Sequence, residues 1–571
     1  NSWQQISGDL TQQIDRNKIP VMGRVQSADA VMKNKSTTMY GNIVALDESP
    51  KQEGLVYIGT DDGLIQVTED NGANWRKIST FVGVPKNTYV NAIVTSKHDA
   101  NVVYAVFNNH KQGDFKPYIL KSSDKGKTWA PIQNNLPIRG SVYDIAEDHV
   151  NPNLLFAGTE FGIFFTIDQG KTWTQLKAGL PTIAVRDIEI QERENDLVLA
   201  TFGRGFYILD DYSPLRTFKP EMMKEKAVIF PIKDALMFVD ARPLGLRGKG
   251  SQGANLFTTP NPEIGAVFTV LINDTTKTTK EIRQEKESKL IKDGKDVAYP
   301  TYEALKIEDN EEKPYLIYTI MDSKGTPVQK IKQPMSYGLN RVVWDFRYAH
   351  QSPIKLKESE PGRYGDKTVG AMALPGNYTV TVHKVFNGEV TELITPTQFK
   401  CNWLEEYAIP MENKADMLAF AQKVEKLRKA SGGTQKYLSD LSKRANFLKK
   451  SIEVVPELSL DMLKEIETII AEIKDINTIM NGDNTKSSRD VETVNSVSEN
   501  IGVIIWNMWR ARTSVTETNR QLYADAGVGL EAVLSKIKMT DAKIKVLENK
   551  LDELGTPFTP GRFAIPDWKM D

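Results

Sequence analysis

Two carboxylates and one guanidinium combine residue types and spacing that allow chemistry. Asp144 and Asp187 lie in separate strand-like runs, and Arg186 directly precedes Asp187. A carboxylate pair provides an acid and a base, and a planar guanidinium grips an anion through two parallel hydrogen bonds. These residues predict either an acid/base and carboxylate-binding site or an ion-pair network that joins neighbouring strands.

Three further polar residues belong to the same candidate site. Tyr143 precedes Asp144 and is a third candidate for catalysis, whereas Asn91 and Arg139 join Arg186 as candidate ligand-binding residues. Asn91 lies in an earlier strand-like run, and Arg139 lies in the loop before residue 142.

Metal and cofactor chemistry is not indicated by the sequence. Cys401 is the only cysteine, which excludes a disulfide within the chain and a Cys-rich metal site. The five histidines are scattered, and no Ser-His-Asp spacing stands out. We therefore expect no metal and no cofactor.

The elements that must position these residues are revealed by an eight-residue repeat, S/T-x-D-x-G-x-x-W. Its defining residues are Thr68, Asp70, Gly72 and Trp75, then Ser122, Asp124, Gly126 and Trp129, then Thr166, Asp168, Gly170 and Trp173. Hydroxyl and carboxylate oxygens bond N–H groups within a turn, glycine supplies φ > 0, and the tryptophan covers the hairpin. The distance between copies suits one four-stranded propeller blade.

Strand phase places the candidate residues on inner strands. A β-branched, aromatic-rich run precedes each repeat, and a fourth run at 197–211 has no glycine or tryptophan completing a repeat. By phase, the innermost strands are 89–94, 142–146 and 185–190. Inner strands line the axis of a propeller, so we expect any ligand site there.

The period of the hydrophobic pattern changes from 2 to 3.6 after Pro410, which predicts a multidomain chain that is mainly β and then α. Breaks at 431–433, Pro456, 481–490 and Gly555 predict four or five antiparallel helices. We expect the following parts: propeller blades with the repeats at 1–212, a connector over the propeller at 213–258, a β-sandwich of immunoglobulin or fibronectin type III kind at 259–402, a helical bundle at 403–555, and an extended tail at 556–571.

The charge and hydropathy of the sequence limit the kinds of partner that we expect. Lys and Arg (73) balance Asp and Glu (74), so net charge gives no reason to expect nucleic acid or an anionic membrane surface. The sequence has no apolar run of the roughly 20 residues that a membrane-spanning helix needs.

The repeat resembles the Asp box, or BNR repeat, of sialidase-type, xyloglucanase-type and sortilin-type propellers. Segments 201–216, 338–347 and 374–378 are similar to bacterial sortilin-like (VPS10-like) Asp-box proteins, many of which are labelled glycosyl hydrolases only by their repeats. The resemblance implies an exported protein of the periplasm, outer membrane surface or extracellular space, of a kind frequent in Bacteroidota.

Two functions follow from this resemblance. The first is a binding or scaffold protein that holds a protein or glycan partner in a cell-envelope assembly. The alternative is a glycoside hydrolase acting in the propeller channel, which requires three arginines and a Tyr–acid pair in sialidase-like sites or two opposed carboxylates in xyloglucanase-like sites. We favour binding, because Arg186 has no second and third arginine at matching positions and the box lies away from the channel.

The first residues match the outer strand of a blade. Trp3 and Ile6 have the spacing of Trp75 and Ile78 and of Trp129 and Ile132. We expect a longer polypeptide whose upstream propeller fragment supplies further blades. The alternative is a four-bladed ring in which residues 3–7 form the outer strand of the last blade.

Overall fold

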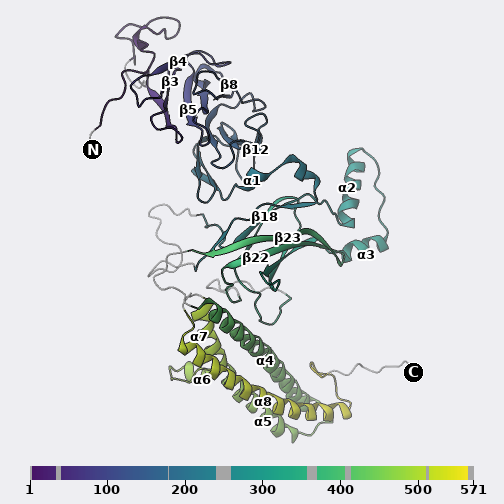
Figure 1. Cartoon of the computed structure of the whole chain (residues 1–571). Coiled ribbons are helices and arrows are strands. Elements are labelled where there is room, and N and C mark those ends of the chain that lie inside the picture. The colour runs from purple at the N-terminus through teal and green to yellow at the C-terminus, as the bar shows by residue number, and fades with distance from the viewer. Residues whose placement is uncertain are drawn as a thin grey trace. The chain divides into compact units, whose positions relative to one another are not determined.

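The computed structural model describes residues 3–33, 40–177, 179–239, 259–356, 370–404, 413–509 and 514–562. The chain divides into two compact units, Asn1–Met222 and Met223–Asp571, whose elements are labelled in Figure 1. Each unit has its own hydrophobic cores.

Four antiparallel sheets build the first unit, and each has its strands in chain order. Their strands are β1 (Ile43–Glu48), β2 (Val56–Thr60), β3 (Ile65–Thr68) and β4 (Arg76–Ile78), then β5 (Tyr89–Thr95), β6 (Val103–Asn108), β7 (Tyr118–Ser122) and β8 (Ala130–Pro131), then β9 (Val142–Glu147), β10 (Leu155–Thr159), β11 (Gly162–Thr166) and β12 (Thr174–Leu176), then β13 (Val185–Gln191), β14 (Asp196–Thr201) and β15 (Phe206–Leu209). A short helix, α1 (Pro214–Thr217), follows the last sheet.

Consecutive sheets pack face to face through shared apolar cores. Phe107 and Tyr57 join the first two sheets, Tyr104 and Phe164 join the second and third, and Phe156 lies in the core of the third and fourth. Inner strands β1, β5, β9 and β13 contact one another in that order. This is the blade arrangement of a β-propeller.

The segment at residues 3–7 does not close a four-bladed ring. In the described part of the chain the last sheet has three strands, and Ile6 lies instead on the first repeat turn, where its carbonyl accepts a hydrogen bond from Trp75 Nε1 (3.2 Å). Ile132 accepts from Trp173 Nε1 (2.8 Å) in the same way. Ile132 follows the outer strand of the second blade and packs on the repeat turn of the third. Ile6 packs on the repeat turn of the first blade in the same way.

Two sheets of the second unit share one core. The first sheet has the strand order β16 (Ala227–Ile229), β18 (Ala266–Ile272), β21 (Gly338–Trp344). The second has the order β17 (Ala235–Met237), β23 (Glu389–Trp403), β22 (Gly376–Phe386), β19 (Tyr315–Asp322), β20 (Pro327–Pro334). The core contains the stacked and edge-on rings of Phe268, Tyr318, Trp344, Tyr378 and Phe399.

The structure corrects two expectations for this region. Part of the predicted connector, 213–258, instead supplies β16 and β17, which pair with β18 and β23; residues 240–258 lie outside the described part. Helices α2 (Thr279–Lys292) and α3 (Tyr302–Asn310) lie within the region predicted to be only β. A capping box formed by Thr278 and Glu281 starts α2. The helix has no buried residue, so its sequence lacks the apolar stripe by which a helix is predicted.

Long helices follow: α4 (Lys414–Val454), α5 (Met462–Asn481), α6 (Asn484–Ser487), α7 (Val497–Trp509) and α8 (Glu517–Glu553). Helices α4, α5, α7 and α8 contact one another around a shared core (Figure 1). The predicted break at 431–433 is wrong, because α4 continues through Gly432 and Gly433. Each glycine costs about 1 kcal/mol in a helix, and buried Leu427 and Leu438 on either side offset that cost.

The tail turns back onto the helices as far as Arg562, beyond which it lies outside the described residues. The buried Arg562 side chain binds Asp552 on α8 at 2.7 Å and donates to the carbonyls of Thr556 and Pro557.

Candidate functional site

A β-bulge at the same position of every inner strand builds the candidate site. The ladder skips Val44 in β1, Asn91 in β5, Tyr143 in β9 and Arg186 in β13. A bulge re-aims the unpaired side chain and increases local twist. Three predicted site residues therefore occupy equivalent positions on consecutive blades.

The bulge residues form one continuous row. Asn91 Nδ2 donates to the backbone carbonyl of Tyr143 (2.5 Å), and the Arg186 guanidinium carbon lies 3.7 Å from the centre of the Tyr143 ring. The guanidinium carbon also lies 5.1 Å from the centre of the Phe202 ring. We call Asn91, Tyr143, Arg186 and Phe202 the bulge row.

The outer end of the row is open to a partner. Arg186 is exposed, and 69% of Phe202 is exposed. Within the described residues, Arg186 makes no ion pair, so its N–H groups are available to an anion. Contact with an aromatic ring restrains a guanidinium, whose planar edge can then bind a carboxylate through two hydrogen bonds.

The two carboxylates lie together, beside the row. The Ile188 N–H donates to Asp144 Oδ2 at 2.8 Å and to Asp187 Oδ1 at 3.2 Å. Asp144 is buried, whereas Asp187 is exposed. Burial, with a smaller contribution from the nearby Asp187 charge, raises the pKa of Asp144 to about 7.

The setting of Asp144 does not suit a glycosidase pair. In glycosidases the two catalytic carboxyl groups face the sugar or a water that lies between them. Asp144 is instead buried, and it accepts a hydrogen bond from the backbone of β13, which also donates to Asp187. Asp144 of β9 therefore ties two neighbouring blades together.

Tyr143 has an acidic partner that sequence analysis missed. Its hydroxyl donates to Glu160, which lies in the turn between β10 and β11. Burial raises the pKa of Tyr143 to about 12, and Glu160 adds to the increase while Arg186 opposes it. The phenol therefore stays protonated at neutral pH and is not activated as a nucleophile.

Glu160 and Phe202 occupy corresponding turns, each directly after the threonine that ends a second strand (Thr159 and Thr201). That repeated position was a usable signal in the sequence. Arg139 is exposed, and in the described part of the chain it makes no hydrogen bond or ion pair with the other candidates.

The three repeat turns lie at the other end of the strands, between the third and fourth strands of each blade. In each, the Ser or Thr oxygen accepts from the glycine N–H at 2.8–2.9 Å, and the aspartate accepts from the N–H four residues later at 2.8–2.9 Å. Hydrogen bonds from Thr128 and its backbone hold the pKa of Asp124 near 2. These turns stabilise the blades and are remote in register from the bulge row.

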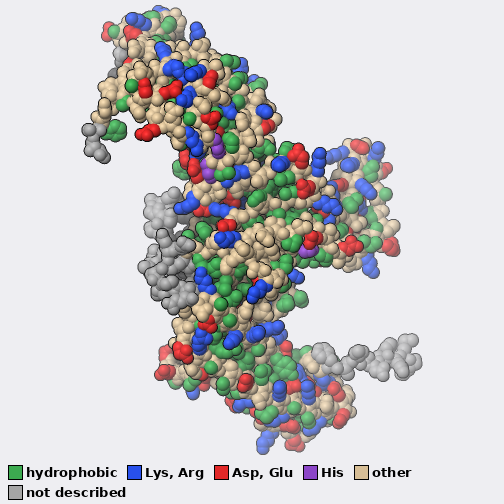
Figure 2. All heavy atoms as spheres, viewed as in Figure 1, with side chains coloured by type: hydrophobic (Ala, Val, Ile, Leu, Met, Phe, Trp, Pro, Cys, Tyr) green, Lys and Arg blue, Asp and Glu red, His purple; other side chains and the backbone are tan. Residues whose placement is uncertain are grey.

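Charge and metal-binding capacity give little further guidance. Figure 2 shows acidic and basic side chains interspersed over the visible face, in keeping with the net charge of −1. Among the described residues, no group of three or more His, Cys, Asp or Glu side chains is placed to hold a metal ion. None of the described helices is long and apolar enough to cross a bilayer.

Radial antiparallel sheets with a shared inner bulge define a β-propeller type of protein. No family model matches the chain. A curated relative is the xyloglucanase of Hypocrea jecorina (strain QM6a), 25% identical over 175 residues, which are 28% of this chain and 21% of the relative. The chain thus spans about a fifth of that relative's length.

Solved structures with similarity include two propeller-type proteins. The GH74 enzyme of Niastella koreensis has a TM-score of 0.26 and 18% identity, covering 42% of this chain and 36% of that one. The Cps50 (Swd1) β-propeller domain of Myceliophteria thermophila has a TM-score of 0.25 and 11% identity, covering 32% of this chain and 56% of that domain.

Proposed function

We propose that the first unit is a binding module that holds a carboxylate-bearing protein or glycan partner at the bulge row. The observation that supports this most directly is Arg186, which lies over the Tyr143 ring and near the Phe202 ring, is exposed, and makes no ion pair in the described structure. A guanidinium fixed in this way loses little side-chain entropy when it binds a planar anion.

A glycoside hydrolase is the second candidate, because the chain shares 25% identity with a xyloglucanase over 175 residues. The local chemistry favours binding over this alternative. Asp144 is buried and shares the Ile188 N–H with Asp187, Tyr143 keeps its proton, and Arg186 is the one arginine on the row.

The wider setting is also a proposal. We propose a sortilin-like Asp-box protein in which a sandwich and a helical bundle follow the propeller, exported to the periplasm, outer membrane surface or extracellular space. Its place is in a cell-envelope assembly, together with further propeller blades from an upstream fragment of the same polypeptide. The sequence resemblance and the position of Ile6 on the first repeat turn support this.

The test compares Arg186→Ala with Arg204→Ala, an exposed arginine in the turn between β14 and β15. Both variants and the parent are applied to an array of uronate, sialate and neutral xyloglucan glycans and to a library of acidic peptides. We expect a carboxylate-bearing probe to bind the parent and the Arg204 variant, and Arg186→Ala to lose about tenfold or more.

Hydrolysis is assayed on the same glycans with Asp187→Asn and Asp144→Asn. Turnover by the parent that falls about 100-fold in either variant establishes the hydrolase and overturns the binding proposal. Binding that is indifferent to Arg186 also contradicts the proposal.

A further inference from the structure

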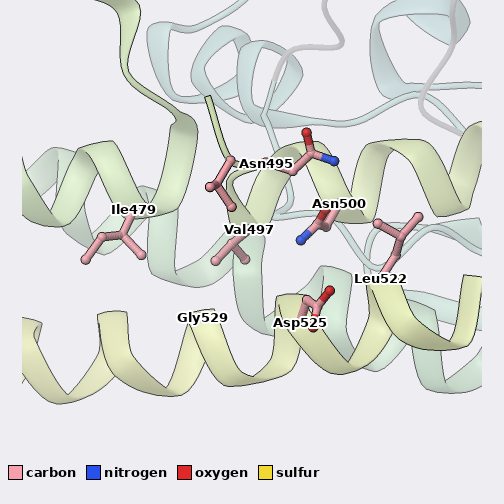
Figure 3. Close-up of a pocket in the computed structure, with 8 residues that line it drawn as sticks. Ile479, Asn495, Val497, Asn500, Leu522, Asp525 and Gly529 are labelled. Carbon is pink, nitrogen blue, oxygen red and sulfur yellow. The ribbon is translucent and has the colours of Figure 1, made fainter. Parts of the chain in front are cut away.

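A cavity of about 330 Å³ opens among helices α5, α7 and α8, in the unit that does not carry the bulge row. Its apolar wall includes Ile479 of α5, Val497 of α7 and Leu522 of α8. Figure 3 shows Val497 and Leu522 on either side of two polar side chains, Asn500 and Asp525. The cavity therefore combines an apolar wall with a small polar centre, as ligand sites do.

Asn500 is an unsatisfied polar group. The residue is only 6% exposed, and within the described residues its Oδ1 atom has no hydrogen-bond partner. A buried acceptor without a donor is costly to a fold, and such groups are uncommon in native proteins. Asn500 lines the cavity, so a bound donor would satisfy it.

Asp525 adds a negative charge at the same place. Its carboxylate accepts a hydrogen bond from Gln521 at 2.9 Å, and it makes no ion pair in the described part of the chain. None of the residues that line the cavity is basic. Figure 3 shows Asp525 on α8 across from Asn500 on α7.

Close helix packing bounds the cavity. A Cβ atom at Gly529 of α8 would lie 2.8 Å from the Val497 side chain, so these helices approach closely beside the opening. The Val497 side chain therefore packs directly against the backbone of α8 at this end of the cavity.

From these contacts we propose that the cavity binds a primary ammonium group on a short alkyl chain. The ammonium group is a donor with no acceptor, so it can satisfy Asn500 Oδ1 and the Asp525 carboxylate together. Its methylene chain contacts Ile479, Val497 and Leu522. The group belongs either to a lysine side chain of a partner polypeptide or to a free alkylamine.

The test uses the full chain and n-butylammonium chloride, followed by saturation-transfer NMR. We expect saturable binding in the millimolar range, because a ligand of five heavy atoms offers limited contact. Butan-1-ol, which matches the length without the charge, is expected to bind at least about fivefold more weakly.

Two variants report on the polar centre. Asp525→Asn and Asn500→Leu are each expected to weaken butylammonium binding by about fivefold or more. Their matched controls lie on exposed positions of α4: Asp440→Asn makes the same charge change, and Asn446→Leu the same change of side chain. Circular dichroism verifies folding, and the exposed Asp525 site keeps the test valid if Asn500→Leu fails to fold.

A peptide arm separates the two sources of the ammonium group. A tripeptide with central lysine and its norleucine counterpart are compared with butylammonium; tighter binding of the lysine peptide identifies a polypeptide partner, and weaker binding identifies a free amine. Absence of saturable binding by any amine, or equal binding by variants and controls, shows that the cavity holds solvent only and overturns the proposal.

Discussion

Asp144 is a buried acid whose proton is retained to unusually high pH. Its pKa is raised from 3.8 to about 7, mainly by burial. Between these values the folded chain binds more protons than the unfolded chain, so the free energy of unfolding falls as pH rises through this window. Above about pH 7 the buried Asp144 carboxylate is charged in the folded chain, and its burial then lowers the free energy of unfolding by the full amount.

We predict that Asp144→Asn stabilises the first unit at pH 8 and flattens its stability between pH 4 and pH 7. Asparagine keeps an acceptor for the Ile188 N–H and removes the charge, whose cost is about 1.4 kcal/mol per pKa unit. Urea unfolding at several pH values measures the change.

Asp70→Asn is a control for which we expect the opposite change in stability, because the pKa of Asp70 is lowered and that of Asp144 is raised. Hydrogen bonds from the Asn74 side chain and backbone lower the pKa of Asp70, so its stabilisation is present above the unfolded pKa and lost as pH falls. Its replacement should destabilise the chain at pH 8. A steeper pH dependence for Asp144→Asn would contradict the interpretation of its burial.

At this scale the sequence predicted Asn91, Tyr143 and Arg186 because strand phase was enough to align the blades. It named Asp144 and Asp187 as a possible carboxylate pair but did not predict the hydrogen bond from Ile188 to Asp144, because strand phase does not give the spacing between two blades. Glu160 and Phe202 were not predicted, because they lie in turns after the second strand of a blade and not on the inner strands or the loops before them.

At the scale of elements, the glycine of each repeat turn is fixed by conformation and contact together. Gly170 has φ = +85°, and a Cβ atom there would lie 2.9 Å from the Ile132 carbonyl oxygen. We predict that Gly170→Ala lowers the free energy of unfolding by about 2–4 kcal/mol. Gly179 has φ = +72°, but no atom lies near the position that its Cβ would take. Gly179→Ala should therefore lower the free energy of unfolding by only about 1 kcal/mol. Equal losses in thermal unfolding would show that conformation alone explains the glycine.

Arg444 of α4 links two acidic residues of α8. It binds Glu548 through two nitrogens at 2.9 and 2.7 Å and Asp541 through a third at 2.7 Å. All three side chains are at most 15% exposed.

We predict that Arg444→Met destabilises the helices by about 3 kcal/mol, because it leaves the buried Glu548 carboxylate without a cation, while Asp541 keeps Lys545 at 2.9 Å. Lys436→Met removes an exposed ion pair on the same helix and should change stability by less than about 0.5 kcal/mol. Urea unfolding followed at 222 nm compares the two variants, and similar effects would argue against a buried pair.

β-branched, aromatic-rich runs predicted the strands of the blades, many of which are buried on both faces, and the 3.6-residue period predicted the apolar stripes of the long helices. Periodicity failed for β16 and β17, which have three residues each and are too short to show alternation. It also failed at Gly432 and Gly433, where packing of the neighbouring turns outweighs low helix propensity.

At the scale of the whole propeller unit, the two terminal sheets leave apolar surface uncovered. In β9 every residue is buried, whereas in β1 Ile43 and Leu46 are 47% and 65% exposed. In β15, Phe206 and Ile208 are 74% and 59% exposed, and among the described residues no fourth strand lies beside this edge strand. Exposed apolar strand edges favour pairing with another sheet.

We therefore predict that the isolated 571-residue chain associates through these sheets unless other blades cover them. Leu46→Lys and Ile208→Lys place a charge on the two apolar faces and should each reduce association, measured by sedimentation velocity over a range of concentrations. Val150→Lys alters an equally exposed loop residue and should leave association unchanged. A chain that stays monomeric at roughly 100 µM, well above the concentration at which micromolar contacts form, would show that these faces are stable in water and need no neighbouring blade.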